Sequence, residues 1–305
     1  MPYDVVIAGG GPAGLSAALT LGRSRRRVLL CDAGPRRNEA ASRVHNFVTR
    51  DGTPPAEFRR IAREQLAAYP NVELSDVPIL RVRGAEGAFE LQTGAAELGA
   101  RRLLLSTGMI DEPYPIEGFA ELWGRGIYQC PYCHGWEIKE RPWGYLLREA
   151  SMHHFAVMLR SWSEQVTVYT QGAVELGPEQ RGELERHGVA LETRPIARLL
   201  RSGDALAGVE LSDGRVVPCE ALYAHPPQRQ VKLVTDLGLE LDAEGYVRVD
   251  PMSRETSLPG IYAAGDLCSR AQSAVFAAAA GAHAAGMINH ELSRELGSAP
   301  STRRA

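Results

Sequence analysis

The segment with the clearest chemical potential is Cys130-Pro131-Tyr132-Cys133-His134, in which two residues separate a pair of cysteines. A thiolate is the nucleophile of disulfide exchange, and Cys-x-x-Cys spacing at a helix start brings both sulfurs within bonding distance and lowers the pKa of one. His134 follows directly, and histidine exchanges protons near neutral pH. The segment therefore predicts catalysis by Cys130, Cys133 and His134, the alternative for His134 being a capping or packing role.

Metal binding is the main competing explanation for this pair. The 305 residues include five cysteines, of which the other three are Cys31, Cys219 and Cys268. Such an odd and sparse set does not form a disulfide framework. A structural zinc site needs four ligands, usually from two Cys-x-x-Cys knuckles, and this chain has one. We therefore expect no metal site, and we expect the other three cysteines to be buried and unreactive.

Composition narrows the class of protein. Hydrophobic residues make up 44% and charged residues 23% of the chain, and the net charge is −3. These values are normal for a globular protein and do not favour nucleic acid or an anionic membrane as partner. No apolar run approaches the ~20 residues of a membrane helix, and the N-terminus lacks the layout of a signal peptide. The sequence thus predicts a cytoplasmic protein.

A glycine-rich motif near the N-terminus predicts a dinucleotide site. Gly9, Gly11 and Gly14 form G-x-G-x-x-G between an expected strand (4–8) and an expected helix (15–21). The first glycine permits the tight turn, the second lets a pyrophosphate approach the backbone, and the third lets helix and strand pack closely. The phosphates then lie at the positive end of the helix.

Asp32 completes this unit, because it ends the next expected strand (27–32) and can bind a ribose hydroxyl. The pattern alone does not distinguish FAD from NAD. A second strand–helix–strand pattern over residues 143–169 indicates a duplicated nucleotide-binding fold. The fold class is therefore α/β, with two Rossmann-like three-layer domains. We expect an FAD domain at 1–112 and 244–297, an inserted domain at 113–243 and a polar tail at 298–305.

Several separated motifs carry a resemblance to a known family: Gly9–Gly14, Ser106–Gly108, Ile116–Gly118, Gly124–Gly126, the cysteine pair, Gly260–Asp266 and Gln272. Over nearly its whole length the chain resembles the low-molecular-weight thioredoxin reductases, which are two-dinucleotide-binding flavoproteins. Gly260–Asp266 resembles their second FAD motif, in which the aspartate holds the ribityl chain. The resemblance implies FAD as cofactor and a homodimer as the assembly.

The resemblance also implies distinct roles for the two sulfurs, with Cys133 against the flavin and Cys130 exchanging with the substrate. The reductases usually carry Ala-Thr between the cysteines and Asp after them. Here Pro131-Tyr132 and His134 stand instead, which resembles the dithiol oxidase branch that includes the gliotoxin and holomycin oxidases. Those enzymes close a disulfide in a small molecule and pass electrons through FAD to oxygen.

The cofactor-binding residues implied by the resemblance come from both halves of the expected FAD domain and from the loop after Asp32. They are Gly9, Gly11, Pro12, Ala13, Gly14, Asp32, Ala33, Arg37, Asn38, His45, Asn46, Val77, Thr107, Gly108, Gly265, Asp266, Gln272 and Ser273.

The second nucleotide domain lacks the corresponding motif. Leu147 and Glu149 stand where a G-x-G-x-x-G would place glycines. Leu147 would crowd the turn, and Glu149 would bring a carboxylate beside a pyrophosphate. The stretch Thr170–Val174 contains no arginine or lysine for a 2′-phosphate. We therefore predict that this domain keeps its fold and does not bind NAD(P)H tightly.

These observations favour an FAD-dependent thiol–disulfide oxidoreductase that oxidises a dithiol and passes electrons to oxygen. The nearest alternative is a thioredoxin reductase-like enzyme that takes electrons from ferredoxin or another flavoprotein, and NADPH is a less favoured donor. A flavin-binding sensor without catalysis is the alternative of another class. The substrate can be a small molecule or a thioredoxin-like protein, and an electron-carrier protein replaces oxygen in the reductase alternative.

Overall fold

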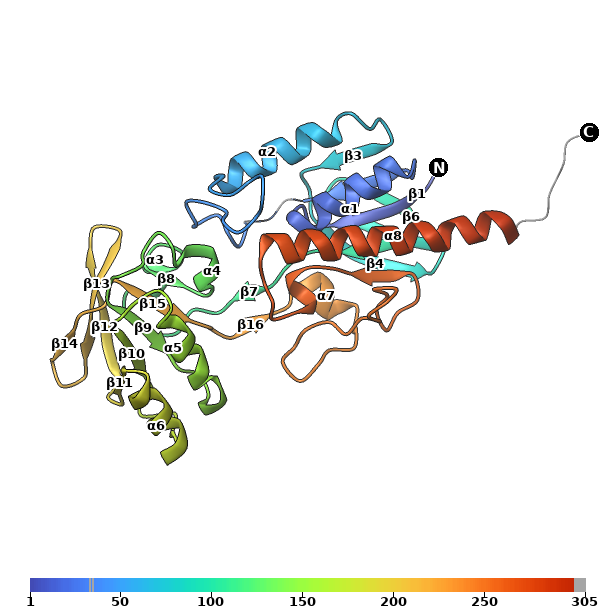
Figure 1. The fold of residues 1–305 in the computed structure, drawn as a ribbon. Helices are drawn as coiled ribbons and strands as arrows, with labels where there is room; N and C mark the ends of the chain where they lie inside the picture. Colours follow the sequence, from blue (N-terminus) through green and yellow to red (C-terminus); the bar gives the residue numbers. More distant parts are fainter. Residues whose placement is uncertain (33, 35, 299–305) are drawn as a thin grey trace, which may run out of the picture. The chain divides into compact units, whose positions relative to one another are not determined.

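The computed structural model describes residues 1–32, 34 and 36–298, and their contacts divide the chain into two units. Unit 1 comprises Met1–Arg37, Pro55–Ile110 and the described residues from Gln228 onwards. Unit 2 comprises Asn38–Pro54 and Asp111–Pro227. Each unit is built around its own sheet (Figure 1).

The sheet of unit 1 has parallel strands in the order β3-β2-β1-β6, with β17 also parallel to β6. An antiparallel branch, β5-β4, continues from β6. Every residue of β2 is buried, as expected for a parallel strand covered on both faces. The strands are β1 (Tyr3–Ala8), β2 (Val28–Cys31), β3 (Val72–Ser75), β4 (Ile79–Ala85), β5 (Ala88–Thr93), β6 (Glu97–Leu105) and β17 (Ile261–Ala263).

Two helices of unit 1, α1 and α8, lie side by side in Figure 1. Small residues allow this approach, since a Cβ added to Gly281 would stand 2.0 Å from the backbone oxygen of Ala13. Arg26 ties the pair together through hydrogen bonds to Asn289 and Ser293. The helices of this unit are α1 (Pro12–Arg23), α2 (Pro55–Leu66), α7 (Lys232–Asp236), the 3-10 turn η2 (Asp266–Cys268) and α8 (Ala274–Ser298).

The main sheet of unit 2 is parallel, with the order β11-β10-β9-β15-β8. A three-stranded antiparallel sheet, β12-β13-β14, accompanies it. The strands are β8 (Ile127–Tyr128), β9 (Trp143–Leu146), β10 (Val166–Tyr169), β11 (Val189–Glu192), β12 (Ile196–Ser202), β13 (Ala205–Leu211), β14 (Val216–Val217) and β15 (Ala221–Ala224). The helices are α3 (Phe119–Leu122), α4 (Pro131–His134), η1 (Ala150–Met152), α5 (His153–Leu159) and α6 (Pro178–Arg186).

The two Rossmann-like sheets confirm the predicted fold class. A separate two-stranded sheet joins β7 (Ile110–Asp111) to β16 (Gln228–Arg229). By its contacts the chain is back in unit 1 at Gln228, upstream of the boundary expected near residue 244. The reason is α7, because its Leu233 and Val234 are buried in the hydrophobic core of unit 1.

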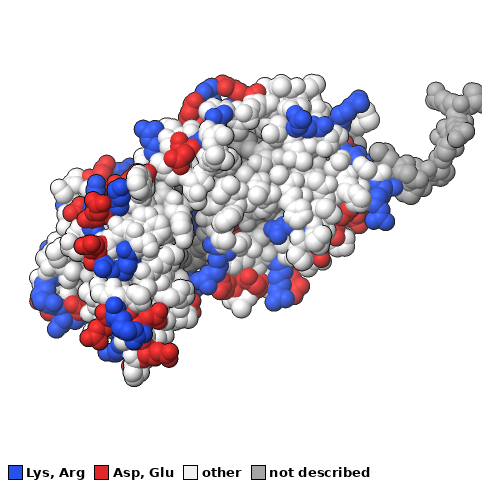
Figure 2. All heavy atoms as spheres, in the orientation of Figure 1, with Lys and Arg blue, Asp and Glu red and all other residues white. Residues whose placement is uncertain are grey.

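The surface mixes charges of both signs. On the face shown in Figure 2, blue and red atoms alternate over unit 2. One cluster joins Arg194 and Arg215 to Glu192 and Asp213 through ion pairs. Among the helices that the structure describes, none is both long enough and apolar enough to cross a membrane.

Candidate functional site

The glycine loop between β1 and α1 has the geometry that its spacing predicts. Gly9 has a φ of +111°, and a Cβ added there would lie 2.4 Å from the carbonyl oxygen of Ser106. A Cβ on Gly14 would lie 1.9 Å from the carbonyl oxygen of Gly9. Around Gly11 an added Cβ would meet nothing within 4 Å. The outer glycines therefore permit close backbone packing, while the middle one faces open space that a ligand can enter.

The N-terminus of α1 is free to receive an anion. Gly11 occupies the N-cap position and provides no side-chain cap, Pro12 follows, and no acidic side chain lies in the first turn. The first amide N–H groups of a helix lack partners within the helix, and the helix dipole makes this end positive. A pyrophosphate can thus bind where the open space beside Gly11 meets this end of the helix.

Two side chains border the glycine loop. The Asp32 carboxylate lies against Gly10, since a Cβ added there would stand 2.5 Å from Asp32 Oδ2, and it accepts a hydrogen bond from Arg59. The hydroxyl oxygen of Thr107 is buried and has no hydrogen-bond partner within the described part of the chain. A buried hydroxyl without a partner is costly, so Thr107 fits a ligand that supplies the missing bond.

The structure brings together three of the expected cofactor residues from distant parts of unit 1. Arg37 Nη1 lies 3.0 Å from Asp266 Oδ2 and donates a 2.5 Å hydrogen bond to Gln272 Oε1. Gln272 in turn donates to the backbone oxygen of Asp266. Gly265, just before Asp266, has a φ of +97°. The turn into η2 thus depends on a glycine and holds the Asp266 carboxylate beside Arg37.

The remaining expected cofactor residues have simpler settings. Ala13 packs against Gly281, and Ser273 accepts a hydrogen bond from the backbone N–H of Phe276. Gly108 has positive φ. Val77 is half-buried in the connection between β3 and β4. Ala33 lies outside the described residues. Asn38, His45 and Asn46 belong to unit 2 by their contacts.

The cysteine pair lies at the start of the single-turn helix α4. Cys130 is its N-cap residue, and the two Sγ atoms are 2.7 Å apart. The thiol of Cys133 and the backbone N–H groups of Cys133 and Tyr132 stabilise a Cys130 thiolate, and they lower its pKa although burial acts in the opposite direction. Cys130 is therefore the sulfur better suited to attack or be attacked by an external thiol.

His134 lies next to the pair in an environment that keeps it neutral. Its ring stacks on Tyr128 at a centroid distance of 4.7 Å. Both ring nitrogens are buried and find no hydrogen-bond partner among the residues that the structure describes. Burial, aided by the nearby His45, lowers its pKa from 6.5 to about 4. A neutral imidazole can accept a proton from a thiol.

An aromatic layer supports this corner of unit 2, and the sequence analysis did not identify it. Tyr223 packs against Tyr128 and Trp143, and Trp143 stacks on Trp162. Trp162 also meets the ring of Tyr132 edge to face at 5.4 Å. The aromatic residues of β8, β9 and β15 therefore form a rigid support below the redox segment.

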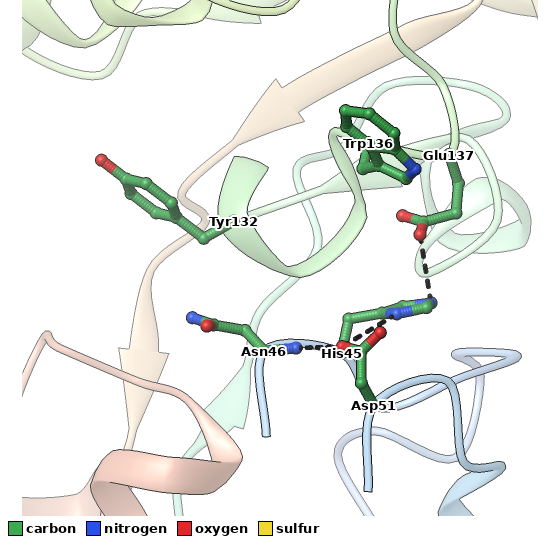
Figure 3. Close-up of a pocket in the computed structure, with 6 residues that line it drawn as sticks. All are labelled: His45, Asn46, Asp51, Tyr132, Trp136 and Glu137. Carbon is green, nitrogen blue, oxygen red and sulfur yellow. Dashed lines mark hydrogen bonds and ion pairs between the residues drawn. The ribbon is translucent and has the colours of Figure 1, made fainter. Parts of the chain in front are cut away.

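A cavity of about 240 Å³ opens beside α4 and is lined by His45, Asn46, Asp51, Tyr132, Trp136 and Glu137. Figure 3 shows His45 between two carboxylates, with its ring nitrogens 3.4 Å from Asp51 and 3.5 Å from Glu137. The backbone N–H of Asn46 also donates to Asp51. Of this group the sequence indicated His45 and Asn46 as cofactor residues and Tyr132 as either a substrate contact or a spacer between the cysteines. The proximity of Trp136 and Glu137 to Cys133 was the available signal for those two.

Comparison with known proteins identifies the family of this chain. The model of the family described as pyridine nucleotide-disulphide oxidoreductase matches residues 3–281. The chain belongs to this family. The oxidoreductase is 33% identical over 279 residues to thioredoxin reductase aclD of Aspergillus oryzae, covering 87% of this chain and 88% of the relative.

Two crystal structures resemble the oxidoreductase closely. That of an oxidoreductase from Agrobacterium tumefaciens has a TM-score of 0.90 and 36% identity, covering 96% of this chain and 99% of the other. That of HlmI has a TM-score of 0.88 and 34% identity, covering 96% and 93%. These matches confirm the predicted thioredoxin reductase-like flavoprotein, with FAD as its cofactor.

The second nucleotide loop of this oxidoreductase differs from the first in geometry as well as in sequence. Leu147 is buried, and its N–H continues the sheet by bonding to Tyr169 O at 2.9 Å. None of residues 147–152, all of which are described, has positive φ. The chain then passes through η1 before α5 begins at His153, whose Nε2 lies 2.7 Å from Glu183. The tight glycine turn of unit 1 has no counterpart here.

The end of β10 in the oxidoreductase also lacks a basic site. Thr170 is buried, and the Gln171 side chain accepts a hydrogen bond from the backbone N–H of Ile196. The neighbouring Glu192 carboxylate is paired with Arg215 at 2.6 Å. Arg215 is therefore held by two acidic side chains, Glu192 and Asp213.

Proposed function

We propose that this flavoprotein is a dithiol oxidase that acts without NAD(P)H. The observation that carries the proposal is the contrast between its two nucleotide loops. The loop of unit 1 has open space at Gly11 beside an uncapped helix. In unit 2, Leu147 is buried in the hydrophobic core directly after β9, and the 3-10 turn η1 leads into α5. Electrons then reach the flavin from the cysteine pair.

The balanced reaction is the oxidation of a dithiol by oxygen to a disulfide and hydrogen peroxide. One substrate thiol loses its proton to His134, and its sulfur attacks the Cys130–Cys133 disulfide at Cys130. The second substrate thiol passes its proton to the Cys133 thiolate released in the first step. Its sulfur then attacks the first substrate sulfur and breaks the bond to Cys130, which closes the substrate disulfide and leaves both enzyme sulfurs reduced. When bound, FAD would supply the two-electron acceptor for the reduced cysteine pair and the route of those electrons to oxygen.

The lowered pKa of Cys130 supports this order, because the sulfur with the more stable thiolate is the better leaving group in the second step. His134 is neutral at physiological pH because burial lowers its pKa to about 4, so a ring nitrogen can accept a proton, although the ring is a weak base until a negative charge forms nearby. The imidazolium that forms is stabilised by the thiolate released beside it.

The residues proposed to hold FAD are those whose geometry fits its parts. Gly11 and the N-terminus of α1 would receive the pyrophosphate, and Asp32 would bind the adenosine ribose. Thr107 offers a buried hydroxyl, and Asp266 would hold the ribityl chain. Arg37 and Gln272 would act as positioning residues for the Asp266 carboxylate.

Two similarities favour an oxidase over a reductase. The Cys-Pro-Tyr-Cys-His segment resembles that of the dithiol oxidase branch, and HlmI, a holomycin dithiol oxidase, is among the similar structures. We extend the proposal to a small-molecule dithiol as substrate, oxygen as acceptor, a cytoplasmic location and a homodimer.

The deciding experiment is an anaerobic titration of the flavin, followed by its absorbance, with dithiothreitol, NADPH and NADH. We expect bleaching by dithiothreitol alone, followed in air by oxygen uptake with one peroxide per disulfide. The Cys130→Ser variant should lose both. Fast bleaching by NADPH would contradict the proposal, and bleaching without oxygen uptake would favour the reductase that uses a protein electron carrier.

A further inference from the structure

The cavity beside α4 is a feature of unit 2 that the redox chemistry leaves unassigned. Two of its lining residues belong to the redox segment, since Tyr132 lies between the two cysteines and Trp136 lies three residues after Cys133. Its volume of about 240 Å³ suits a small organic molecule or part of one. A molecule held here therefore lies beside the sulfur chemistry.

The charge of the lining has one sign. Asp51 and Glu137 contribute two carboxylates, and none of the six lining residues is a lysine or arginine. His45 lies between the carboxylates, with ring nitrogens 3.4 Å from Asp51 and 3.5 Å from Glu137, so one imidazole faces two acids. The side chains of Asp51 and Glu137 are 65% and 43% exposed, so their oxygens can still meet a ligand. The cavity thus attracts positive charge and N–H donors and repels anions.

Trp136 adds an aromatic surface to this acidic cavity. Its side chain is 70% exposed, unusually high for so large an apolar group. The ammonium nitrogen of Lys139 lies 3.4 Å from the centroid of its ring, which shows that the indole already attracts a cation. Most of the ring remains uncovered and can accept a flat ring or a second cation. Figure 3 shows Trp136 beside Glu137, with His45 and Asp51 facing them.

The cavity also adjoins the proposed base. Tyr132 of the lining and His134 belong to the same single-turn helix, α4. A ligand seated against His45 and Trp136 would therefore present its thiols to the corner where Cys130 and His134 lie. The cavity therefore has two properties that bear on the choice of substrate. It contacts the redox segment, and its lining is acidic and aromatic.

We infer that this cavity holds the non-sulfur part of the dithiol substrate and selects a small ring-bearing molecule that is cationic or rich in N–H donors. The inference rests on the proposed function for the identity of the substrate. Asp51 and Glu137 act as specificity residues, and Trp136 supports the ring. A dithiol that carries carboxylates is disfavoured.

The test compares two dithiols of opposite charge that can both close an unstrained cyclic disulfide, 2-amino-1,4-dimercaptobutane and dihydrolipoate, by oxygen uptake. For the wild type we expect a kcat/KM at least about ten-fold higher for the amine. The isosteric variants Asp51→Asn and Glu137→Gln should each reduce this ratio by about three-fold or more. Glu185→Gln, an exposed acid on α6, is the matched control and should leave it unchanged. Because each ratio compares the same two dithiols, their different thiol acidities cancel between variants.

A second measurement does not depend on turnover. Calorimetric titration of the FAD-loaded protein with benzylamine and with benzoate should show tighter binding of benzylamine. Trp136→Leu should weaken that binding more than Trp136→Phe, which keeps an aromatic ring. Equal binding of the two probes, or a charge ratio that Asp51→Asn and Glu137→Gln leave unchanged, would overturn the inference. So would a kcat/KM for reduced thioredoxin above that for the amine dithiol.

The two proposals fail in different ways. Absence of oxygen uptake with dithiothreitol contradicts the oxidase, while selective binding of benzylamine would still support the cavity as a cation site. Uptake with dithiothreitol but no charge preference supports the oxidase and contradicts the cavity assignment.

Discussion

Replacing His134 by phenylalanine should make the protein less sensitive to acid. The wild-type imidazole stacks on Tyr128, and its two buried nitrogens have no hydrogen-bond partner in the described part of the chain. A phenyl ring can keep the stacking without burying unpaired nitrogens, so His134→Phe should fold as well as the wild type near neutral pH. The difference between the two proteins should then appear only as the pH falls.

The direction of this pH effect follows from the protonation of His134 in the folded and in the unfolded protein. Burial and the nearby His45 lower the pKa of His134 from 6.5 to about 4 in the folded protein. Between these values the unfolded chain binds a proton that the folded protein does not, so acid favours unfolding. The free energy of unfolding therefore carries no penalty from His134 above pH ~6.5, and it decreases as the pH falls towards ~4. From about pH 7.5 to about pH 5 this one group costs about 2 kcal/mol, and the loss levels off near ~3 kcal/mol below pH ~4.

Urea unfolding of the FAD-loaded protein, followed by circular dichroism at about pH 7.5 and about pH 5, measures this loss. The wild type should lose about 2 kcal/mol more than His134→Phe between the two conditions. Replacement of His154, an exposed histidine of the same unit, by phenylalanine is the matched control and should follow the wild type. Parallel losses in wild type and His134→Phe would refute the buried, neutral state of His134.

Three further outcomes are expected. Gly11→Ala should fold normally yet lose FAD affinity about ten-fold or more. Gly14→Ala should in addition lower the melting temperature, because its Cβ meets the backbone. Flavin absorbance measures the first effect and thermal melts measure the second. In the reduced enzyme near neutral pH, iodoacetamide should label Cys130 well before Cys219, whose pKa is raised to about 12 by burial, as peptide mass spectrometry will show. The single change Leu147→Gly should not produce NADPH-dependent bleaching of the flavin, since the whole connection to α5 lacks the glycine turn.

The parts of the site that sequence could predict are local. The G-x-G-x-x-G spacing from Gly9 to Gly14 defines a turn through contacts between residues a few positions apart. The Cys130/Cys133 pair likewise depends on a single helical turn. The contact between His45 and Glu137 could not be predicted this way, because a loop and a distant segment come together only in the folded unit. The stacking of Tyr128 on His134 could not be predicted either, since the position of Tyr128 depends on where β8 ends.

The return of the chain to unit 1 illustrates the same limit. The sequence predicted a return to the FAD domain near residue 244, yet the described structure places α7 in the core of unit 1 through Leu233 and Val234. A short amphipathic helix does not reveal from its own sequence which of two cores it will join. That choice depends on the complementary surface, which the strands of the N-terminal third provide.

Loss of the second glycine loop did not release unit 2 from structural constraint. Its parallel sheet also supports the redox segment, since β8 leads into α4 and pairs with β15, which pairs with β9. Tyr223 of β15 packs on Tyr128 of β8, and that tyrosine stacks on His134. A glycine turn is needed only where a pyrophosphate approaches the backbone, whereas this sheet is needed wherever the sulfurs must be held. A sheet that positions Cys130 and Cys133 therefore does not require a glycine-rich turn after β9, and in this protein the sheet is present without one.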